Sequence, residues 1–314
     1  MGRYLARRLL IALPTLLGLS FLIFVLVSAA PGDPAEELAR RRNSASEVTQ
    51  QEVDDIRKEL RLDRPFFTQY GLWLKGAVTG DLGESFYKKR PVADEIRDRI
   101  PATAELAGAG FVLVLVLAVP LGVAAAMFHR HWADHGMRFL ALIFASVPGF
   151  FLAYLLIIVF ATKLKLFPVA GRQGIDSLVL PALALAAPAT AVVSRLLRSS
   201  LLEVFTEDFM RTARSKGLRS IQVVVRHGLR NAAIPVATYM GGLMAGLLEG
   251  AVIVEVIFAW PGMGRLTFEA ISQRDYPMIQ AVVLFAGGVY LFMNLLVDMS
   301  YRLLDPRIRL DAAT

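Results

Sequence analysis

Acidic side chains inside long apolar runs are the first residues of this sequence that could do chemistry. Glu249, Glu255 and Asp298 lie within such runs or at their ends, where a charge at the bilayer centre costs roughly 2.5–3.5 kcal/mol on insertion scales. Each acid therefore needs a partner, in a solute or proton pathway or in a structural hydrogen bond between helices. Glu249 and Glu255 are separated by about 9 Å of helical rise and lie at different depths. Glu249 is the deeper acid and the better candidate for a cavity, whereas Glu255 is a candidate for holding the turn into Trp260.

Other patterns of reactive residues are incomplete in the sequence. No Gly-Lys pair is present to begin a Walker A loop, whose glycine amides and lysine would hold the phosphates of ATP. Neither Gly-x-Ser-x-Gly nor His-Glu-x-x-His occurs, so nucleophilic and zinc hydrolysis have no motif. We expect a chain that is not itself an enzyme and binds no cofactor, so that any ATP and magnesium would belong to partner subunits.

A histidine cluster is the remaining candidate for metal binding. His129, His131 and His135 are close together in the sequence, beside Arg130 and Asp134. No cysteine or further acid completes a metal shell there, so we predict a polar turn and no metal site. An intramembrane enzyme would need a reactive dyad inside an apolar run, and the sequence offers no persuasive arrangement of that kind.

The composition indicates that the chain spans a membrane. Of 314 residues, 55% are hydrophobic, and the mean hydropathy is +0.52, above the values of ordinary soluble domains. Apolar runs of the roughly 17–25 residues needed to cross a bilayer predict membrane spans at 9–32, 106–128, 139–162, 177–194, 231–248 and 276–297. The chain has no cysteine, which excludes disulfides and thiolate metal sites.

The basic residues are distributed as the positive-inside rule requires for a chain with both termini in the cytoplasm. Arginine and lysine are frequent before the first run, between the fourth and fifth runs and after the last. They are fewer in the two short loops that this orientation places outside, and the loop at 31–101 is too long to contribute. The net charge of +7 therefore fits membrane orientation better than nucleic-acid binding.

The first run and the long loop after it each have two interpretations. Residues 1–30 could be a cleaved signal peptide, but the apolar stretch is longer than the roughly 7–15 residues of a signal core, which favours an uncleaved first helix. In the loop, Thr49-Gln-Gln-Glu52 forms a capping-box pattern before Val53, Ile56 and Leu60 at helical spacing. We predict a small extracytoplasmic helical cap, with a flexible solvated loop as the alternative.

The segment between the fourth and fifth runs is the most informative stretch of the sequence. It predicts two short amphipathic helices separated at Gly217, with acids near the start of the first helix and bases toward its end, as the helix dipole favours. A basic amphipathic segment could also lie on anionic lipid. A short helix projecting from the membrane could instead sit in a groove of a partner, so that motion of the partner moves the adjoining spans.

This segment resembles the coupling loop of ABC importer permeases in the form found in the oligopeptide, dipeptide and nickel permease family. Arg211-Thr-Ala-Arg-Ser-Lys-Gly-Leu218 and Arg226-His-Gly-Leu-Arg-Asn231 follow the version of that family, with Arg211-Thr212-Ala213 at the positions of the broader Glu-Ala-Ala pattern. The resemblance implies that ATPase coupling is carried by Asp208, Phe209, Arg211, Thr212, Ala213, Lys216, Gly217, Leu218, His227 and Leu229.

The resemblance extends over nearly the whole chain and is to the first of the two paired permeases of that family. It is carried by Pro31-Gly-Asp-Pro34, Leu62-Asp-Arg-Pro65, Gly80-Asp-Leu-Gly83 with Ser85, Pro101-Ala-Thr103, Glu255 to Gly264, Arg274-Asp-Tyr-Pro277, Asn294 to Asp298 and Asp305-Pro-Arg307. In relatives we expect a small residue at the position of Glu249, so the acid at this position would reflect the particular solute of this protein.

The resemblance implies an all-α integral membrane protein with six transmembrane helices, both termini cytoplasmic and the type I ABC importer permease fold. The expected parts are a first transmembrane helix at 1–30, an extracytoplasmic cap at 31–101, a five-helix core at 102–303 with the coupling loop at 199–231, and a cytoplasmic tail at 304–314. The expected location is the cytoplasmic, or inner, membrane of a bacterium or archaeon.

The implied function is the permease subunit of an ATP-driven, binding-protein-dependent importer of peptides or related small solutes, working by alternating access. The implied partners are a second homologous permease, two ATP-binding subunits, an extracytoplasmic substrate-binding protein and membrane lipid, with no nucleic acid. The alternative is a proton-coupled secondary transporter that uses the intramembrane acids. Such transporters show related halves, and this sequence has no internal repeat.

Overall fold

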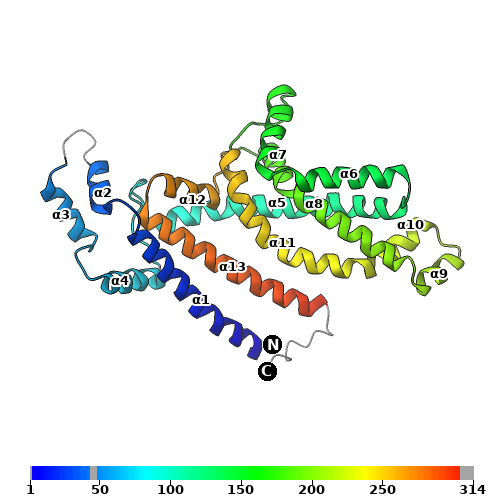
Figure 1. Ribbon diagram of the computed structural model, residues 1–314, viewed down its shortest axis with the longest axis horizontal. Helices are drawn as coiled ribbons and strands as arrows, with labels where there is room; N and C mark the ends of the chain where they lie inside the picture. Colours follow the sequence, from blue (N-terminus) through cyan, green and yellow to red (C-terminus); the bar gives the residue numbers. More distant parts are fainter. Residues whose placement is uncertain (1, 43–47, 305–314) are drawn as a thin grey trace. The chain divides into compact units, whose positions relative to one another are not determined.

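The computed structural model describes residues 2–42 and 48–304, which are almost entirely helical (Figure 1). In this part of the chain the only β-type contact is an isolated bridge between Glu84 and Pro91. The chain divides into two compact units. The first contains the described residues up to Pro101 together with Arg265–Phe292, and the second contains Ala102–Gly264 and the described residues from Met293.

The helices follow one another along the chain with short connections. They are α1 (Gly2–Ser28), α2 (Pro34–Arg42), α3 (Gln50–Glu59), α4 (Phe66–Thr79), α5 (Val92–Met127), α6 (Trp132–Ser146), α7 (Gly149–Leu156), the π-helix η1 (Ile157–Lys163), α8 (Ile175–Val204), α9 (Asp208–Ser215), α10 (Ser220–Val223), the π-helix η2 (Val224–Gly228), α11 (Leu229–Ile257), α12 (Met263–Ser272) and α13 (Tyr276–Leu304).

Five segments of the described chain are long and apolar enough to cross a membrane. They are Leu10–Ser28, Val92–Met127, Ile175–Val204, Ser220–Leu248 and Tyr276–Val297. The run predicted at 139–162 is a sixth candidate, but it is broken into Asp134–Ser146 and Gly149–Lys163, which meet at 106°. Proline disfavours the helical conformation of the residue before it, and Val147, which precedes Pro148, is extended with ψ 124°.

The first unit contains a helical cap between α1 and α5. Thr49 and Glu52 form the predicted capping box at the start of α3, in which the Glu52 N–H donates to the Thr49 hydroxyl and the Thr49 N–H donates to the Glu52 carboxylate. Val53 and Ile56 are buried on the inner face of α3 beside Leu38 of α2. Burial of these apolar side chains gives the first unit a small core, to which Phe86 and Tyr276 also belong.

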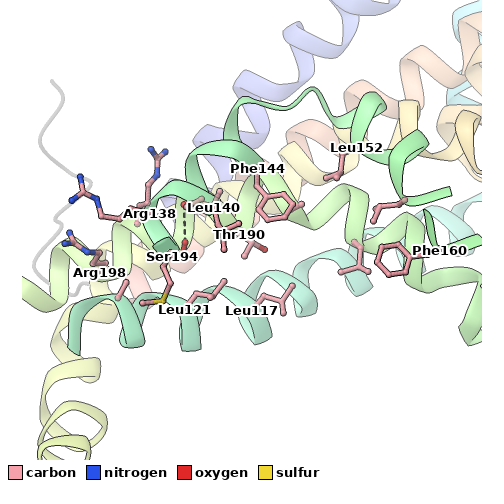
Figure 2. Close-up of a pocket in the computed structure, with 18 residues that line it drawn as sticks. Leu117, Leu121, Arg138, Leu140, Phe144, Leu152, Phe160, Thr190, Ser194 and Arg198 are labelled. Carbon is pink, nitrogen blue, oxygen red and sulfur yellow. Dashed lines mark hydrogen bonds between the residues drawn. The ribbon is translucent and has the colours of Figure 1, made fainter. Parts of the chain in front are cut away.

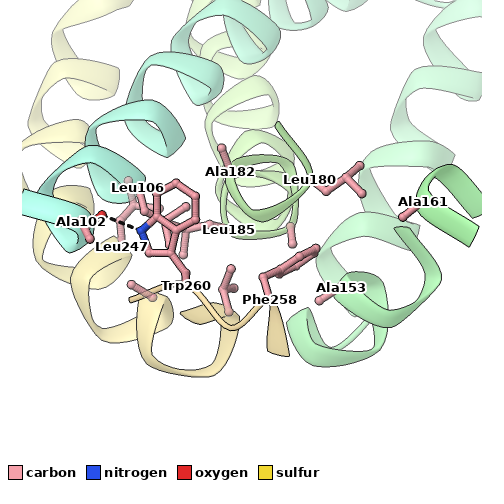
Figure 3. Packing of buried hydrophobic residues seen from close by; sticks show 13 residues of the cluster. Ala102, Leu106, Ala153, Ala161, Leu180, Ala182, Leu185, Leu247, Phe258 and Trp260 are labelled. Carbon is pink, nitrogen blue, oxygen red and sulfur yellow. Dashed lines mark hydrogen bonds between the residues drawn. The ribbon is translucent and has the colours of Figure 1, made fainter. Parts of the chain in front are cut away.

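The second unit is built around α8, which packs against α6, α7 and α11. One core cluster surrounds Trp260, whose indole N–H donates to the Ala102 carbonyl at 2.8 Å (Figure 3). At Gly122 of α5 a Cβ atom would lie 2.9 Å from the Ser194 carbonyl oxygen of α8. The missing side chain therefore lets these two helices approach closely, as small residues do between membrane helices.

Candidate functional site

The loop between α8 and α11 is a compact helical element. After α8 ends at Val204, α9 runs from Asp208 to Ser215, and α10 and η2 lead into α11 at Leu229. The two predicted short helices are therefore present, and the turn between them lies at Gly217. Gly217 has φ +77° and open space around its Cα, so this position uses the left-handed conformation that glycine adopts at little cost.

One face of this loop is buried against the end of α8. Met210, Ala213 and Val223 form a cluster with Phe205, and Met210 has no exposed surface. Gly228 lies beside the same cluster, because a Cβ there would be 3.4 Å from the Met210 Cε atom. These packed side chains hold α9 at the end of α8, since well-packed apolar contacts deform little.

Other side chains of the loop are exposed, and they include both apolar and basic residues. Phe209, Leu218 and Ile221 are 41%, 36% and 48% exposed, although their side chains are apolar. Arg211 and Lys216 are exposed on the same loop, and Arg211 forms a solvent-exposed pair with Asp208 at 3.5 Å. Such exposed ion pairs contribute little to stability, so these charges are available to a partner.

The structure gathers the predicted coupling residues into this one element. Asp208, Phe209, Arg211, Thr212, Lys216, Gly217 and Leu218 are exposed, His227 and Leu229 are half-buried, and Ala213 is buried. Ala213 therefore belongs to the packed seat of α9, and the exposed residues are the ones that could contact another protein. Sequence reasoning alone did not separate these two groups.

Glu255 holds the turn between α11 and α12. It has no exposed surface, and the Thr103 hydroxyl donates to its carboxylate at 2.6 Å while accepting from the Met263 N–H at 2.8 Å. The backbone N–H of Trp260 donates to the backbone carbonyl of Glu255 at 2.8 Å. A Cβ on Gly262 would collide with the Glu255 carboxylate. This geometry corresponds to the structural hydrogen bond considered for Glu255. The side chains of Glu249 and Asp298 lie outside what the structure describes.

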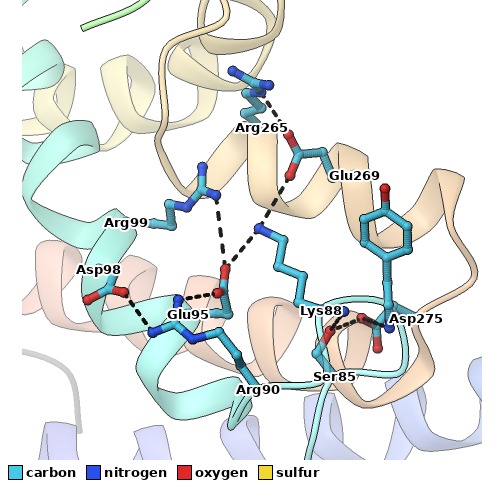
Figure 4. Close-up of polar contacts among 10 residues, drawn as sticks. Ser85, Lys88, Arg90, Glu95, Asp98, Arg99, Arg265, Glu269 and Asp275 are labelled. Carbon is cyan, nitrogen blue, oxygen red and sulfur yellow. Dashed lines mark hydrogen bonds and ion pairs between the residues drawn. The ribbon is translucent and has the colours of Figure 1, made fainter. Parts of the chain in front are cut away.

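A second buried carboxylate holds the turn between α12 and α13. Asp275 is 2% exposed and accepts from the Ser85 hydroxyl (Figure 4). It also accepts from the backbone N–H groups of Phe86, at 3.1 Å, and Tyr87, at 3.4 Å. Ser85 and Asp275 each belong to a motif that the sequence singled out, but 190 residues separate them. The sequence offers no signal that would pair them.

A network of ion pairs surrounds Glu95 in the same unit. Glu95 is 4% exposed and pairs with Lys88 at 2.8 Å and Arg90 at 2.8 Å. Lys88 also reaches Glu269 at 3.6 Å, which links the start of α5 to α12 (Figure 4). These opposite charges satisfy one another, so the network stabilises one arrangement of the first unit's turns.

The histidine cluster belongs to a polar turn between α5 and α6. Asp134 is 1% exposed and accepts two hydrogen bonds from the Arg198 guanidinium, at 2.8 and 2.7 Å. His129 lies 3.5 Å from Asp134 and 3.1 Å from Arg198. Within residues 2–42 and 48–304 no group of three His, Cys, Asp or Glu side chains is arranged to hold a metal ion.

Comparison with protein families assigns the chain to a class. Residues 118–310 match the family described as the inner membrane component of binding-protein-dependent transport systems. Residues 1–107 match the N-terminal region of the membrane components of the same systems. The chain therefore belongs to this family and is a permease component of a binding-protein-dependent ABC importer, as the resemblance predicted.

Individual relatives are similar over their whole length. The glutathione transport system permease protein GsiC of Escherichia coli strain K12 is 40% identical over 309 residues, which cover 98% of this chain and 99% of that protein. GsiC of Shigella dysenteriae serotype 1 has the same identity and coverage. The motifs that carried the resemblance thus lie within an alignment of almost the entire chain.

Solved structures show the same fold. An inward-facing structure of the MetNI methionine ABC transporter matches with a TM-score of 0.55 and 17% identity, covering 67% of this chain and 96% of that chain. An amino acid ABC transporter with histidines matches with a TM-score of 0.52 and 14% identity, covering 67% and 94%. At these identities the likeness concerns the fold alone, which is that of ABC importer permeases.

Proposed function

We propose that this chain imports peptides or closely related small solutes as one of two homologous permeases in an ATP-driven complex. Two ATP-binding subunits would hold ATP and magnesium, and an extracytoplasmic binding protein would deliver the solute. Transport would proceed by alternating access, in which closure of the ATPases rocks the permease pair. The peptide class is supported by the whole-length similarity to glutathione permeases.

One observation carries the coupling role: the loop between α8 and α11 has a packed seat and an exposed apolar face. Met210 and Ala213 fix α9 on α8, whereas Phe209 and Leu218 remain exposed. An apolar surface rimmed by basic side chains is typical of a docking helix. Force applied by a partner at Phe209 would therefore reach the end of α8 through rigid contacts.

We further propose six transmembrane spans with both termini in the cytoplasm of a bacterial or archaeal cell, in its cytoplasmic membrane. In this topology the bent pair α6 and α7 with η1 counts as one span, and the loop between α8 and α11 faces the cytoplasm. The helical cap of α2, α3 and α4 would face outward, toward the binding protein. The distribution of basic residues supports this orientation.

The alternative of a proton-coupled transporter has less support. It requires Glu249, Glu255 and Asp298 to act as a relay, yet Glu255 has no exposed surface and accepts a hydrogen bond from Thr103. A proton relay needs groups that reach water or one another. Family membership also favours the importer.

The test is transport by the complete complex, reconstituted in vesicles, with Phe209→Ala and Leu218→Ala combined. Loss of two interface anchors should reduce binding-protein-stimulated ATP hydrolysis and solute uptake about tenfold. The matched control is Phe292→Ala, which removes an aromatic side chain that is 58% exposed on α13 and should leave both rates unchanged. Uptake that persists without ATPase subunits and follows a proton gradient would refute the proposal.

A further inference from the structure

The second unit contains a long apolar cavity that no proposed step of transport uses. It has a volume of about 470 Å³, within the range of roughly 300–1,000 Å³ found for small-molecule sites. Its walls come from α5, α6, α7, η1 and α8, and most of its lining side chains are apolar, among them Leu117, Leu121, Phe144 and Leu152. A ligand that fills this space must itself be largely apolar.

One end of the cavity is basic. Arg138 of α6 and Arg195 and Arg198 of α8 line that end, and Figure 2 shows Arg138 and Arg198 gathered there, away from Leu152 and Phe160. Arg198 is engaged with Asp134, which is the acid of this end. In the part of the chain that the structure describes, Arg138 and Arg195 lie within ion-pair distance of no carboxylate, and both are exposed.

Thr190 does not interrupt the apolar wall. The residue lines the cavity and is 7% exposed, but its hydroxyl oxygen is buried and has no hydrogen-bond partner among the described residues. Because that oxygen has almost no accessible surface, a ligand in the cavity cannot bond to it. The polar groups that a ligand can reach therefore lie at the basic end.

We propose that this cavity binds one acyl chain of an anionic membrane phospholipid. The acyl chain occupies the apolar length of the cavity, and the phosphate lies at Arg138 and Arg195. Anionic lipids are attracted to basic residues at the membrane surface.

The charge and the lining favour lipid over the other occupants. A peptide-like solute carries many amide groups, and apart from the basic end the only polar side chains of the wall are those of Thr190 and Ser194. The Ser194 hydroxyl already donates to the Ala191 carbonyl. A helix of the second permease would leave the exposed cations Arg138 and Arg195 unpaired unless it carried acids at that position. In an anionic lipid, the acyl chain matches the apolar part of the cavity and the phosphate matches its basic end.

The experiment is photolabelling of the complete transport complex in nanodiscs. The probes are phosphatidylglycerol and phosphatidylcholine that carry the same diazirine-bearing acyl chain, with labelled residues located by mass spectrometry. We expect label within 117–125 and 140–144, with phosphatidylglycerol favoured. Replacing Arg138→Gln and Arg195→Gln should reduce labelling by phosphatidylglycerol about fivefold for each arginine and leave labelling by phosphatidylcholine unchanged.

Two matched pairs keep the test specific. Ala141→Trp fills the cavity and should abolish label in these segments, whereas Ala145→Trp, on the same helix but outside the lining, should not. Arg230→Gln removes an exposed arginine elsewhere and should have no effect. The proposal would be overturned if both lipids label these segments equally and the arginine replacements do not change the labelling. It would also be overturned if the second permease covers these segments and prevents labelling, or if glutathione competes with the lipid probe.

Discussion

The turns at the two ends of α12 and the loop between α8 and α11 both connect long apolar helices, but they use polar side chains in opposite ways. At the turns, Glu255 and Asp275 are buried and accept hydrogen bonds from the chain around them. On the loop, Phe209 and Arg211 are exposed, and Arg211 forms a solvent-exposed pair with Asp208 at 3.5 Å. The turns are satisfied by hydrogen bonds from this chain, whereas we propose that the loop presents a surface for another protein.

The physical reason for this difference is the cost of unsatisfied groups. A buried carboxylate that has lost its donors is expensive, so the residues around it can adopt one arrangement only. An exposed side chain on a packed seat keeps its position through apolar contacts and leaves its outer atoms free. Rigidity at the turns and availability on the loop therefore come from different residues, which mutation can separate.

The largest effect should come from Asp275→Ala. The change leaves the Ser85 hydroxyl and the N–H groups of Phe86 and Tyr87 without their acceptor, at a cost of about 3–5 kcal/mol in stability. We expect a poor yield of the purified complex and a lowered unfolding temperature. Asp275→Asn keeps an acceptor oxygen, so its unfolding temperature should lie between those of Asp275→Ala and wild type. If Asp275→Ala unfolded at the wild-type temperature, the carboxylate would not be what fixes this turn.

A smaller loss is expected from Gly262→Ala. Its Cβ would collide with the Glu255 carboxylate, and overpacking of this kind costs about 1–3 kcal/mol. Gly242→Ala is the matched control, because Gly242 has open space around it. Gly262→Ala should therefore unfold at a lower temperature than Gly242→Ala. Equal unfolding temperatures of the two variants would contradict the tight contact at the α11–α12 turn.

Gly217→Ala should act on coupling more than on overall stability. The left-handed conformation at φ +77° costs an L-residue about 1–2 kcal/mol, although no neighbouring atom obstructs the new Cβ. We expect lower binding-protein-stimulated ATP hydrolysis with nearly unchanged thermal unfolding. Gly136→Ala, at a helical position with open space, should leave ATP hydrolysis unchanged and thermal unfolding unchanged or slightly higher, because alanine favours the helix. A loss of function there would mean that the assay is not specific to the loop.

The smallest expected effect is the pH dependence of stability that Asp33 contributes beside the cap. Burial raises the pKa of the Asp33 carboxyl, but hydrogen bonds from the Arg57 guanidinium and the Ala35 N–H outweigh it and hold the pKa below its ordinary value of 3.8. Because the folded pKa is the lower one, this contribution is present above pH 3.8 and is lost as the pH falls below it.

The variant Asp33→Asn isolates this contribution. At pH 7 it should unfold at a temperature lower than wild type by no more than about 2 °C, because the pair is partly exposed. The difference should shrink when both proteins are unfolded near pH 3. A difference that grows on acidification would contradict the role of the ionised carboxylate.

Much of the fold could be predicted because membrane spans depend on local composition. Apolar runs locate five of the candidate spans directly, and the capping-box pattern locates the start of α3 at Gln50. The run at 139–162 was predicted as one span but is bent at Pro148. A proline can kink a helix or end it, and the outcome depends on the packing of α6 and α7 against α8, which local sequence does not contain.

The candidate site was predictable to a similar extent. The motif from Arg211 to Leu218 located the loop, but the burial of Ala213 and the exposure of Phe209 depend on how α9 lies on α8. The partnership of Thr103 with Glu255, 152 residues away, also requires the folded chain. Sequence patterns report short-range periodicity, and such contacts lie beyond it.

The most direct test of the account is crosslinking from two single cysteines, since the chain has none of its own. Phe209→Cys on the loop and Phe67→Cys on the cap, where Phe67 is 76% exposed, would each carry a maleimide photocrosslinker in the complete complex with its binding protein. We predict that Phe209→Cys links to the ATP-hydrolysing subunit and Phe67→Cys to the binding protein. A link from Phe209→Cys to the binding protein, or no link in a complex that hydrolyses ATP, would contradict the account.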